Sequence, residues 1–305
     1  MGANPDLTTT VAGLALPNPI IPASGCAGYG REFAKHFELR RLGGLAAKAL
    51  SLEPRRGNPP PRVAEAAAGM LNAVGLQNPG WDLWAHDELP WMLEQDVILI
   101  QNIVGHTVAD YVELARRLEG TAVDAIEINL SCPNVADGMS FGAEPDGVEA
   151  VTAAVRAVTR KPLWVKLTPQ TASIVATAAA AARAGADAVS LINTIPAMVI
   201  DVERRRPVLR NNTGGLSGPA IRPVALRMVN EVYRAVAIPI VGIGGIETVE
   251  DVVAFLLAGA SAVQIGTAAL VHPTRPVDLV TDLAVWCRSH GVARVTDLIG
   301  ALELW

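Results

Sequence analysis

Two neighbouring stretches, PIVGIGGIETVEDV (residues 239–252) and ASAVQIGTAAL (residues 260–270), indicate the fold. In each, a short apolar run ends at a glycine, and in the first a helical sequence follows directly. This is the order of a β-strand that leads into an α-helix. Parallel strands need a crossover connection between them, usually a helix, so repeated βα units build a parallel sheet. The two stretches therefore predict an α/β fold and show which repeat to look for elsewhere.

The same repeat occurs eight times along the chain. The predicted strands are Pro19–Pro22, Gly44–Ala49, Val97–Val104, Ala125–Leu130, Leu163–Leu167, Ala188–Asn193, Ile240–Ile243 and Ala262–Ile265. The predicted helices are Arg31–Arg41, Gly80–Met92, Val108–Leu118, Val148–Thr159, Ala172–Ala184, Pro223–Val236, Val249–Ala258 and Val277–His290. Eight such units in 305 residues predict a (β/α)₈ TIM barrel, with residues 1–305 as a single domain. Thr9–Asn18 is expected to form a hairpin that closes the bottom of the barrel.

Two connections are longer than ordinary βα loops, Ser51–Pro79 and Thr194–Arg222. Both follow predicted strands and should lie on the C-terminal face, where TIM barrels carry their catalytic groups. Each is therefore predicted to be a lid or a binding loop.

Composition excludes several classes of protein. Half of the residues are hydrophobic, and the net charge of −5 gives no long-range attraction to nucleic acids or anionic membranes. Val252–Val271 has no charge over the length of a membrane span, but its glycines and polar residues favour a helix end followed by a strand. The three cysteines form no CxxC pair and the N-terminus has no signal-peptide pattern, so we expect a cytoplasmic protein without disulfides.

The glycine turns of the opening stretches predict a phosphate site. Gly242, Gly244 and Gly245 lie at the end of the seventh predicted strand and just before a helix, and Gly266 and Thr267 follow the eighth. Loops after strands seven and eight form the common phosphate site of TIM barrels. The dinucleotide pattern GxGxxG is absent, which favours a mononucleotide or a phosphosugar over NAD; turns without function are the alternative.

Cys132, in the stretch NLSCPN (residues 129–134), lies just past the end of the fourth predicted strand. A thiol there could act as a nucleophile or a proton-transfer base, or could simply be a small buried hydrophobic group. No Cys–His–Asn arrangement is evident, which makes nucleophilic acyl transfer the weaker functional choice.

Lysines and amides also gather at the predicted strand ends. Lys48 and Lys166 could form a Schiff base or hold negative charge on a flavin or its phosphate. Asparagine side chains both donate and accept hydrogen bonds, which suits a cyclic ureide or a flavin ring, although each alone is also typical of a turn or cap. These asparagines are Asn72, Asn78, Asn102, Asn129, Asn134 and Asn193. No HExxH motif, cysteine pair or closely spaced histidine set occurs, so no metal site is expected.

Taken together, these motifs resemble the class I dihydroorotate dehydrogenases over nearly the whole chain. The matching motifs, in order, are PASGCAGYG, AKAL, NAVGLQNPG, NLSCPN, WVKLTP, LINT, NTGGLSGPAI, GIGGI and QIGTA. The GLQNPG form of the long loop is similar to that of the B-type catalytic subunit. One departure lies at Ile195–Pro196–Ala197, where the family pattern has a glycine before Met198.

The resemblance implies an FMN site, a substrate site and a catalytic base. FMN is expected to contact Ser24, Lys48, Ala49, Asn102, Asn129, Lys166, Ile192, Gly218, Gly244, Gly245, Gly266 and Thr267. The substrate is expected to contact Lys48, Asn72, Ala73, Val74, Gly75, Leu76, Asn129, Asn193 and Thr194. Cys132 is expected to be the general base that removes the C5 proton of dihydroorotate while hydride leaves C6 for FMN, yielding orotate for pyrimidine (UMP) biosynthesis.

Electrons must then leave the FMN. Three cysteines are fewer than the four that an iron–sulfur cluster usually needs, and no NAD fingerprint is present. The resemblance therefore implies a partner subunit with FAD and a [2Fe–2S] cluster that reduces NAD⁺, joined to a homodimeric core in a heterotetramer. The alternatives are a fumarate-using A-type enzyme, a dihydropyrimidine or dihydrouridine oxidoreductase, a Schiff-base aldolase that uses Lys166, and a non-catalytic binding module.

Overall fold

The computed structural model describes residues 4–130 and 141–305. Their central feature is an eight-stranded parallel sheet in the order β3-β16-β15-β10-β9-β8-β7-β4. The Gly43 N–H donates to the Ile20 carbonyl oxygen at 2.8 Å, which joins the two outermost strands of this order and closes the barrel. The strands are β3 (Ile20–Pro22), β4 (Leu45–Leu50), β7 (Leu99–Ile103), β8 (Ala125–Asn129), β9 (Leu163–Lys166), β10 (Ala188–Leu191), β15 (Ile240–Ile243) and β16 (Ala262–Ile265). The eight predicted strands and the TIM-barrel fold are confirmed.

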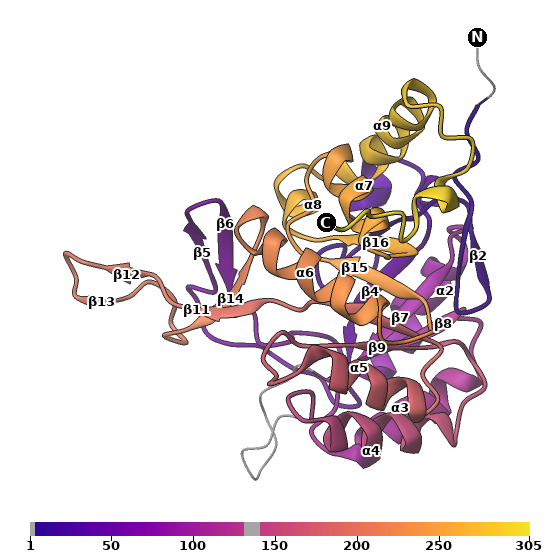
Figure 1. Ribbon diagram of the computed structural model, residues 1–305. Coiled ribbons are helices and arrows are strands. Elements are labelled where there is room, and N and C mark those ends of the chain that lie inside the picture. Colours follow the sequence, from indigo (N-terminus) through magenta and orange to yellow (C-terminus); the bar gives the residue numbers. More distant parts are fainter. Residues whose placement is uncertain (1–3, 131–140) are drawn as a thin grey trace.

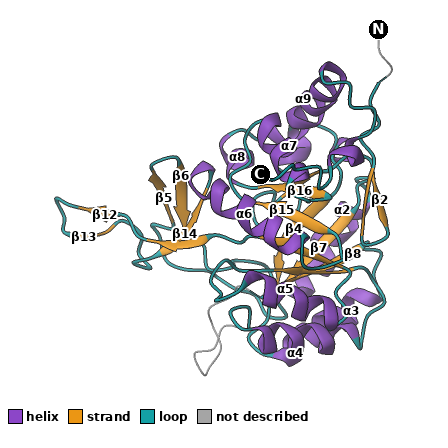
Figure 2. Cartoon of the chain, in the orientation of Figure 1, coloured by secondary structure: helices purple, strands orange, loops and turns teal. Residues whose placement is uncertain are grey.

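Helices surround the barrel, as Figure 1 and Figure 2 show. The longer ones are α3 (Val108–Glu119), α4 (Pro145–Arg156), α5 (Ile174–Arg183), α6 (Arg222–Tyr233), α7 (Val249–Leu257) and α9 (Arg275–Ser289). The shorter ones are α1 (Trp81–Leu83), the π-helical η3 (Trp84–Glu88), α2 (Leu89–Leu93), α8 (Thr267–Val271), η4 (Pro219–Ile221) and η5 (Val295–Leu298). Capping boxes at Thr107 and Thr248 fix where α3 and α7 begin, because each threonine accepts from the backbone N–H of an aspartate three residues later.

Apolar side chains fill the barrel near the N-terminal ends of its strands, which is called the lower part below. Trp164 is fully buried there against small and branched neighbours such as Ala46 and Ile100. The hairpin of β1 (Thr9–Val11) and β2 (Leu14–Leu16) packs Val11 and Leu16 against this cluster from below. The predicted hairpin and its place are therefore confirmed. A larger apolar cluster lies between the sheet and the helices.

The predicted helix Arg31–Arg41 is wrong. The structure has two single 3₁₀ turns in its place, η1 (Phe33–Lys35) and η2 (Leu39–Arg41). Glu38 between them is extended, with φ −72° and ψ 122°, and no side chain caps either turn. An extended residue breaks the helical hydrogen-bond ladder, so the apolar spacing here serves two separate turns.

The two long connections are not open loops. They contribute four strands to a second sheet in the order β11-β14-β6-β5, in which all paired strands are antiparallel. These strands are β5 (Val63–Ala66), β6 (Gly69–Asn72), β11 (Ile195–Ala197) and β14 (Gly214–Ser217). Pro196 lies on β11 at the edge of this sheet, where a residue without an N–H is tolerated.

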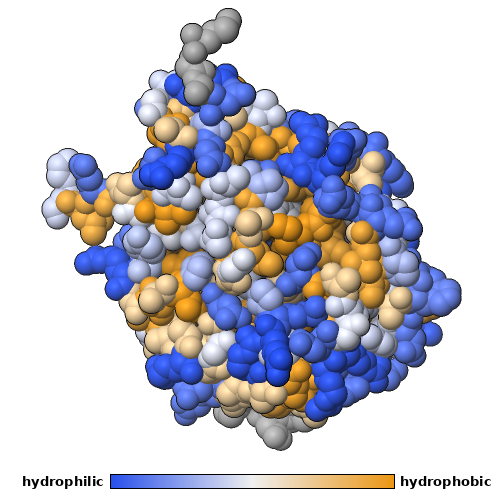
Figure 3. Space-filling view, turned by 90° about the vertical axis from the view of Figure 1, so that its right-hand side faces the viewer, coloured by the Kyte–Doolittle hydropathy of each residue, from blue (hydrophilic) through white to orange (hydrophobic). Residues whose placement is uncertain are grey.

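The hairpin of β12 (Ile200–Asp201) and β13 (Arg206–Pro207) projects far from the barrel (Figure 1). On the side of the molecule that carries β2, hydrophobic patches are interrupted by hydrophilic side chains (Figure 3).

Val252–Val271 forms most of α7, then β16 and α8, as predicted for a helix end and a strand. Among residues 4–130 and 141–305, no helix is both long and apolar enough to cross a bilayer.

Candidate active site

Polar side chains replace the apolar filling toward the C-terminal ends of the strands. Side chains two residues apart on a strand face the same side. Moving two residues up from the inward-facing Ile100, Ala125 and Trp164 reaches Asn102, Glu127 and Lys166. The barrel interior therefore changes from a hydrophobic plug to a layer of polar side chains just below its C-terminal face, where the site was predicted.

Lys166 links two distant parts of the chain in this polar layer. It is 5% exposed at the end of β9, and its Nζ donates to Ser24 Oγ at 3.0 Å. Ser24 lies in the turn after β3, so the bond brings together two predicted FMN contacts that are 142 residues apart. Burial raises the pKa of the nearby Cys26 thiol to about 11, and the positive charge of Lys166 partly opposes this rise. The ammonium group of Lys166 is thus held in place with a hydroxyl partner.

The predicted amide residues at the end of β8 and just after β10 also meet. Asn193 Nδ2 lies 3.5 Å from Asn129 Oδ1, and Asn193 Oδ1 accepts from the backbone N–H of Thr194 at 2.7 Å. The Tyr111 hydroxyl donates to the Asn129 carbonyl at 2.9 Å. Three of the predicted substrate contacts therefore form one connected group.

Lys48 is half-buried near the end of β4. The pKa of its ammonium group is lowered, chiefly by burial and then by the positive charge of Arg62, while Glu32 acts in the opposite direction. Ala49, which follows it, is buried. Arg62 was not predicted as a site residue, and it adds positive charge near Lys48.

The predicted substrate loop, residues 72–76, leaves β6 and is held by hydrogen bonds to the segment before it. The Ala73 N–H donates to the Arg62 carbonyl at 2.7 Å, and the Asn58 N–H donates to the Val74 carbonyl at 3.0 Å. Gly75 and Leu76 both have positive φ, of 75° and 56°.

The same loop joins the other substrate residues through the second sheet. Asn72 pairs with Gly215 of β14. Thr194 lies so close to Gly215 that a Cβ there would be 2.0 Å from Thr194 Oγ1. The second sheet therefore brings the loop and Thr194 together.

Three glycines beside strands β15 and β16, called the glycine cradle below, allow neighbouring segments to pack closely. Gly218, Gly244 and Gly245 have φ of 93°, 129° and 75°, a region that side chains rarely adopt. A Cβ at Gly245 would lie 2.8 Å from the Gly218 carbonyl oxygen, and one at Gly218 would lie 3.5 Å from Thr267 Cγ2. Thr267 Oγ1 also donates to Ser217 Oγ at 2.8 Å. The predicted phosphate residues therefore converge, and Gly266 leads directly into α8.

A buried carboxylate lies within the polar layer and was not predicted. Glu127 is fully buried on β8 and accepts hydrogen bonds from Asn102, Ser190 and Gln264. The signal in the sequence was the charge within the apolar run AIEIN, because an unpaired carboxylate is rarely buried in a strand. Ile192, another predicted FMN contact, is buried directly after β10.

Two predicted residues of the chemistry, Cys132 and Asn134, lie outside the described residues. Within the described ranges, no group of three or more His, Cys, Asp or Glu side chains is arranged to hold a metal ion.

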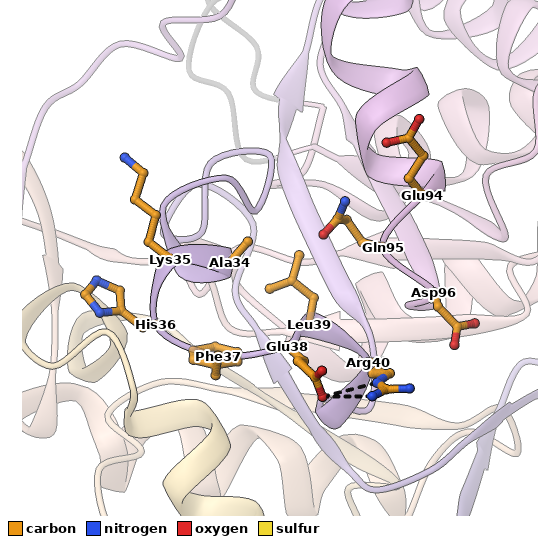
Figure 4. Close-up of a pocket in the computed structure, with 10 residues that line it drawn as sticks. All are labelled: Ala34, Lys35, His36, Phe37, Glu38, Leu39, Arg40, Glu94, Gln95 and Asp96. Atoms are coloured by element: carbon orange, nitrogen blue, oxygen red, sulfur yellow. Dashed lines mark hydrogen bonds and ion pairs between the residues drawn. The ribbon is translucent and has the colours of Figure 1, made fainter.

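A separate surface depression of about 500 Å³ is lined by residues 34–40 and 94–96 (Figure 4). These residues precede β4 and β7 and so lie toward the opposite end of the barrel. The depression is not part of the candidate site.

Comparison with known proteins decides the family. A family model described as dihydroorotate dehydrogenase matches residues 6–284. The chain belongs to the dihydroorotate dehydrogenase family. This confirms the resemblance that the motifs predicted.

Members of the dihydroorotate dehydrogenase family from several bacteria are similar to this chain over nearly its full length. A Pelobacter propionicus protein is 51% identical over 301 residues, which are 98% of this chain and 99% of that protein. A Geobacter protein is 49% identical over 302 residues, with the same coverage, and a Bacillus pumilus protein is 50% identical over 296 residues, 96% of each chain. Each is named dihydroorotate dehydrogenase B (NAD(+)), catalytic subunit.

Proposed function

We propose that this chain is the catalytic subunit of a B-type dihydroorotate dehydrogenase, which oxidises (S)-dihydroorotate to orotate in pyrimidine biosynthesis. The observation that carries the proposal is that the Lys166–Ser24 pair, the Asn129–Asn193 pair and the glycine cradle meet at one end of the barrel. The names of the bacterial relatives support the B type over the fumarate-using A type.

FMN fits the residues that are present. At Gly218, Gly244 and Gly245 an added Cβ would lie 2.7–2.8 Å from other atoms of the chain, so only glycine lets these segments pack this closely. Gly244 and Gly245 belong to the loop after β15, and the loops at this position of a TIM barrel commonly hold a phosphate through backbone N–H groups. In the polar layer, the buried Oδ1 of Asn102 has no hydrogen-bond partner among the described residues. A flavin ring carries an imide N–H that could satisfy it. We infer that Ser24, Lys48, Asn129 and Lys166 also contact the FMN.

FMN supplies a hydride acceptor for C6 of the substrate. The chain's own residues bind the substrate and move its proton. Lys48 offers positive charge to the substrate carboxylate, while Asn129, Asn193 and Thr194 offer donors and acceptors to the ureide ring. Cys132 removes the proton from C5 as the general base. Lys166 provides positive charge where the ring gains electrons.

Substitution of Cys132 tests the assigned base. Cys132→Ala should retain bound FMN but lose most of its reduction by dihydroorotate, because no other group on this chain is assigned to accept the C5 proton. In the wild type, the rate of FMN reduction by dihydroorotate should rise with pH as the Cys132 thiol ionises, since the ordinary pKa of a thiol is about 8.5. Unimpaired single-turnover reduction in Cys132→Ala would remove Cys132 from this role.

A partner subunit is the proposed route for electrons to NAD⁺. The relatives are named catalytic subunits, which supports the existence of a second subunit. We infer that this subunit carries FAD and a [2Fe–2S] cluster and binds a homodimer of this chain in a heterotetramer in the cytoplasm. The purified chain should reduce its FMN with dihydroorotate yet reduce NAD⁺ poorly until the partner is added. Full NAD⁺ reduction by the chain alone would contradict the proposed partner.

A further inference from the structure

We propose that Glu127 is a positioning residue that fixes the side-chain amide of Asn102 with its oxygen available to the imide N–H of the flavin. The inference rests on the proposed FMN site. It concerns a residue that the site predicted from sequence did not include.

Glu127 collects three hydrogen bonds from three other strands of the barrel. Asn102 Nδ2 of β7 donates to one carboxylate oxygen at 2.6 Å. Ser190 Oγ of β10 and Gln264 Nε2 of β16 each donate to the other oxygen at 2.8 Å. All four side chains are fully buried, so these bonds are sheltered from water.

The carboxylate determines which way the Asn102 amide faces. An ionised carboxylate only accepts hydrogen bonds, so Asn102 must present its NH₂ group to Glu127. Its Oδ1 is thereby left as a buried acceptor, with no partner among the described residues. A buried acceptor without a donor is costly, and in native proteins such groups usually meet a ligand or water. The imide N–H of an oxidised flavin ring is a donor of the required kind.

The position of Asn102 agrees with this role. It pairs with Glu127 in register, above the apolar plug, while the next inward residues toward the C-terminal face are Asn129 and Lys166. A flavin ring that contacts Lys166 above the apolar plug would therefore have Asn102 below it or at its edge. Glu127 would not contact the ring itself and would act on it through Asn102.

Glu127→Gln tests the orientation directly, because glutamine has nearly the same shape but only one acceptor oxygen. If its oxygen keeps the bonds from Ser190 and Gln264, its NH₂ group faces Asn102. Two donors cannot bond to each other, so the Asn102 amide must turn over and present Nδ2 where Oδ1 was. With the glutamine in this orientation, only the bond to Asn102 has to change. In the opposite orientation the glutamine NH₂ group would face Ser190 and Gln264, and both of their bonds would have to change. We expect FMN binding to weaken by about 10- to 100-fold, or about 1.4 to 2.8 kcal/mol.

The double variant Glu127→Gln with Asn102→Asp should restore binding. One oxygen of the aspartate accepts a hydrogen bond from the glutamine NH₂ group, and its other oxygen is again available to the flavin. The direction of the hydrogen bond between positions 102 and 127 is therefore reversed, but the flavin still meets an acceptor. The double variant also carries its negative charge at position 102, closer to the flavin than position 127. The midpoint potential of the flavin should therefore become more negative. Ser190→Ala is the matched control, since it removes a donor to Glu127 without changing Asn102, and its FMN affinity should equal that of the wild type.

The experiment measures the FMN dissociation constant, the flavin absorption spectrum and the midpoint potential, with thermal unfolding of the FMN-free chains as a check of folding. Weak binding by Glu127→Gln and recovery to within tenfold of wild type in the double variant support the proposal. Unchanged FMN affinity in Glu127→Gln, or equal loss in both variants, overturns it. If Glu127→Gln does not fold, the double variant decides alone: binding supports the proposal, and failure to bind or to fold overturns it. A wild-type chain that binds no FMN would instead overturn the proposed function.

Discussion

Gly245 offers a sharp test of the proposed phosphate cradle, through the substitution Gly245→Ala. Its φ of 75° lies in the left-handed region, where an alanine costs about 1–2 kcal/mol. The added Cβ would lie 2.7 Å from Arg222 Cβ and 2.8 Å from the Gly218 carbonyl oxygen. Ordinary contact begins at 3.4 Å, so both neighbours would have to move away by about half an ångström or more.

The movement falls on the residues that form the cradle. Because Gly218 is itself held at positive φ against Gly69 and Thr267, its shift would distort the proposed phosphate site. We expect the FMN-free chain to lose about 2–3 kcal/mol of stability from the combined backbone strain and overpacking. FMN binding should weaken at least about tenfold.

Two measurements check this prediction, FMN titration by fluorescence quenching and urea unfolding of the FMN-free chain. Gly120→Ala is the control, because Gly120 has a negative φ at the end of α3 and an added Cβ would meet only the Arg117 carbonyl at 3.6 Å. The control should bind FMN like the wild type and retain its stability. If Gly245→Ala bound FMN as tightly as the wild type, the cradle would not be the phosphate site.

Two further predictions concern the barrel interior and the thiol of Cys26. Trp164→Ala should cost about 3–5 kcal/mol in urea unfolding because it empties the centre of the barrel plug. Trp164→Phe should cost less, since the indole N–H has no partner among the described residues; equal losses would contradict this reading. Burial raises the pKa of the Cys26 thiol above its ordinary value, to about 11, so Cys26 in the unfolded chain ionises first as the pH rises. The free energy of unfolding should therefore fall more between about pH 9 and 11 in the wild type than in Cys26→Ser, and parallel pH curves would refute the prediction.

The sequence predicted the barrel well because its strands carry their own signal. Each strand is a short apolar run between turn residues, and burial on both faces makes that pattern nearly continuous. The region Arg31–Arg41 failed because apolar spacing alone cannot distinguish one helix from two turns. The extended conformation of Glu38 depends on packing that local sequence does not encode.

The second sheet was missed for a different reason. Its central pair joins Leu71 to Leu216, 145 positions apart in the chain, and neither strand has the length or the alternation of an obvious strand. Pairing over such a distance is set by the barrel that brings the two segments together.

The candidate site was partly open to prediction. The motifs located the lysines, asparagines and glycines, and the structure brings Ser24 to Lys166, Asn129 to Asn193, and Gly245 to Gly218. Glu127 was missed because its significance depends on three partners from distant strands. The roles of all these residues, and that of Cys132, remain predictions for experiment.

The most direct test of the central claim is anaerobic rapid mixing of the FMN-loaded chain with dihydroorotate, without NAD⁺ or a partner subunit. Flavin absorption near about 450 nm should bleach in a single turnover, with one orotate formed for each flavin reduced. A flavin that stays oxidised while dihydroorotate is bound would contradict the claim that this chain catalyses the oxidation.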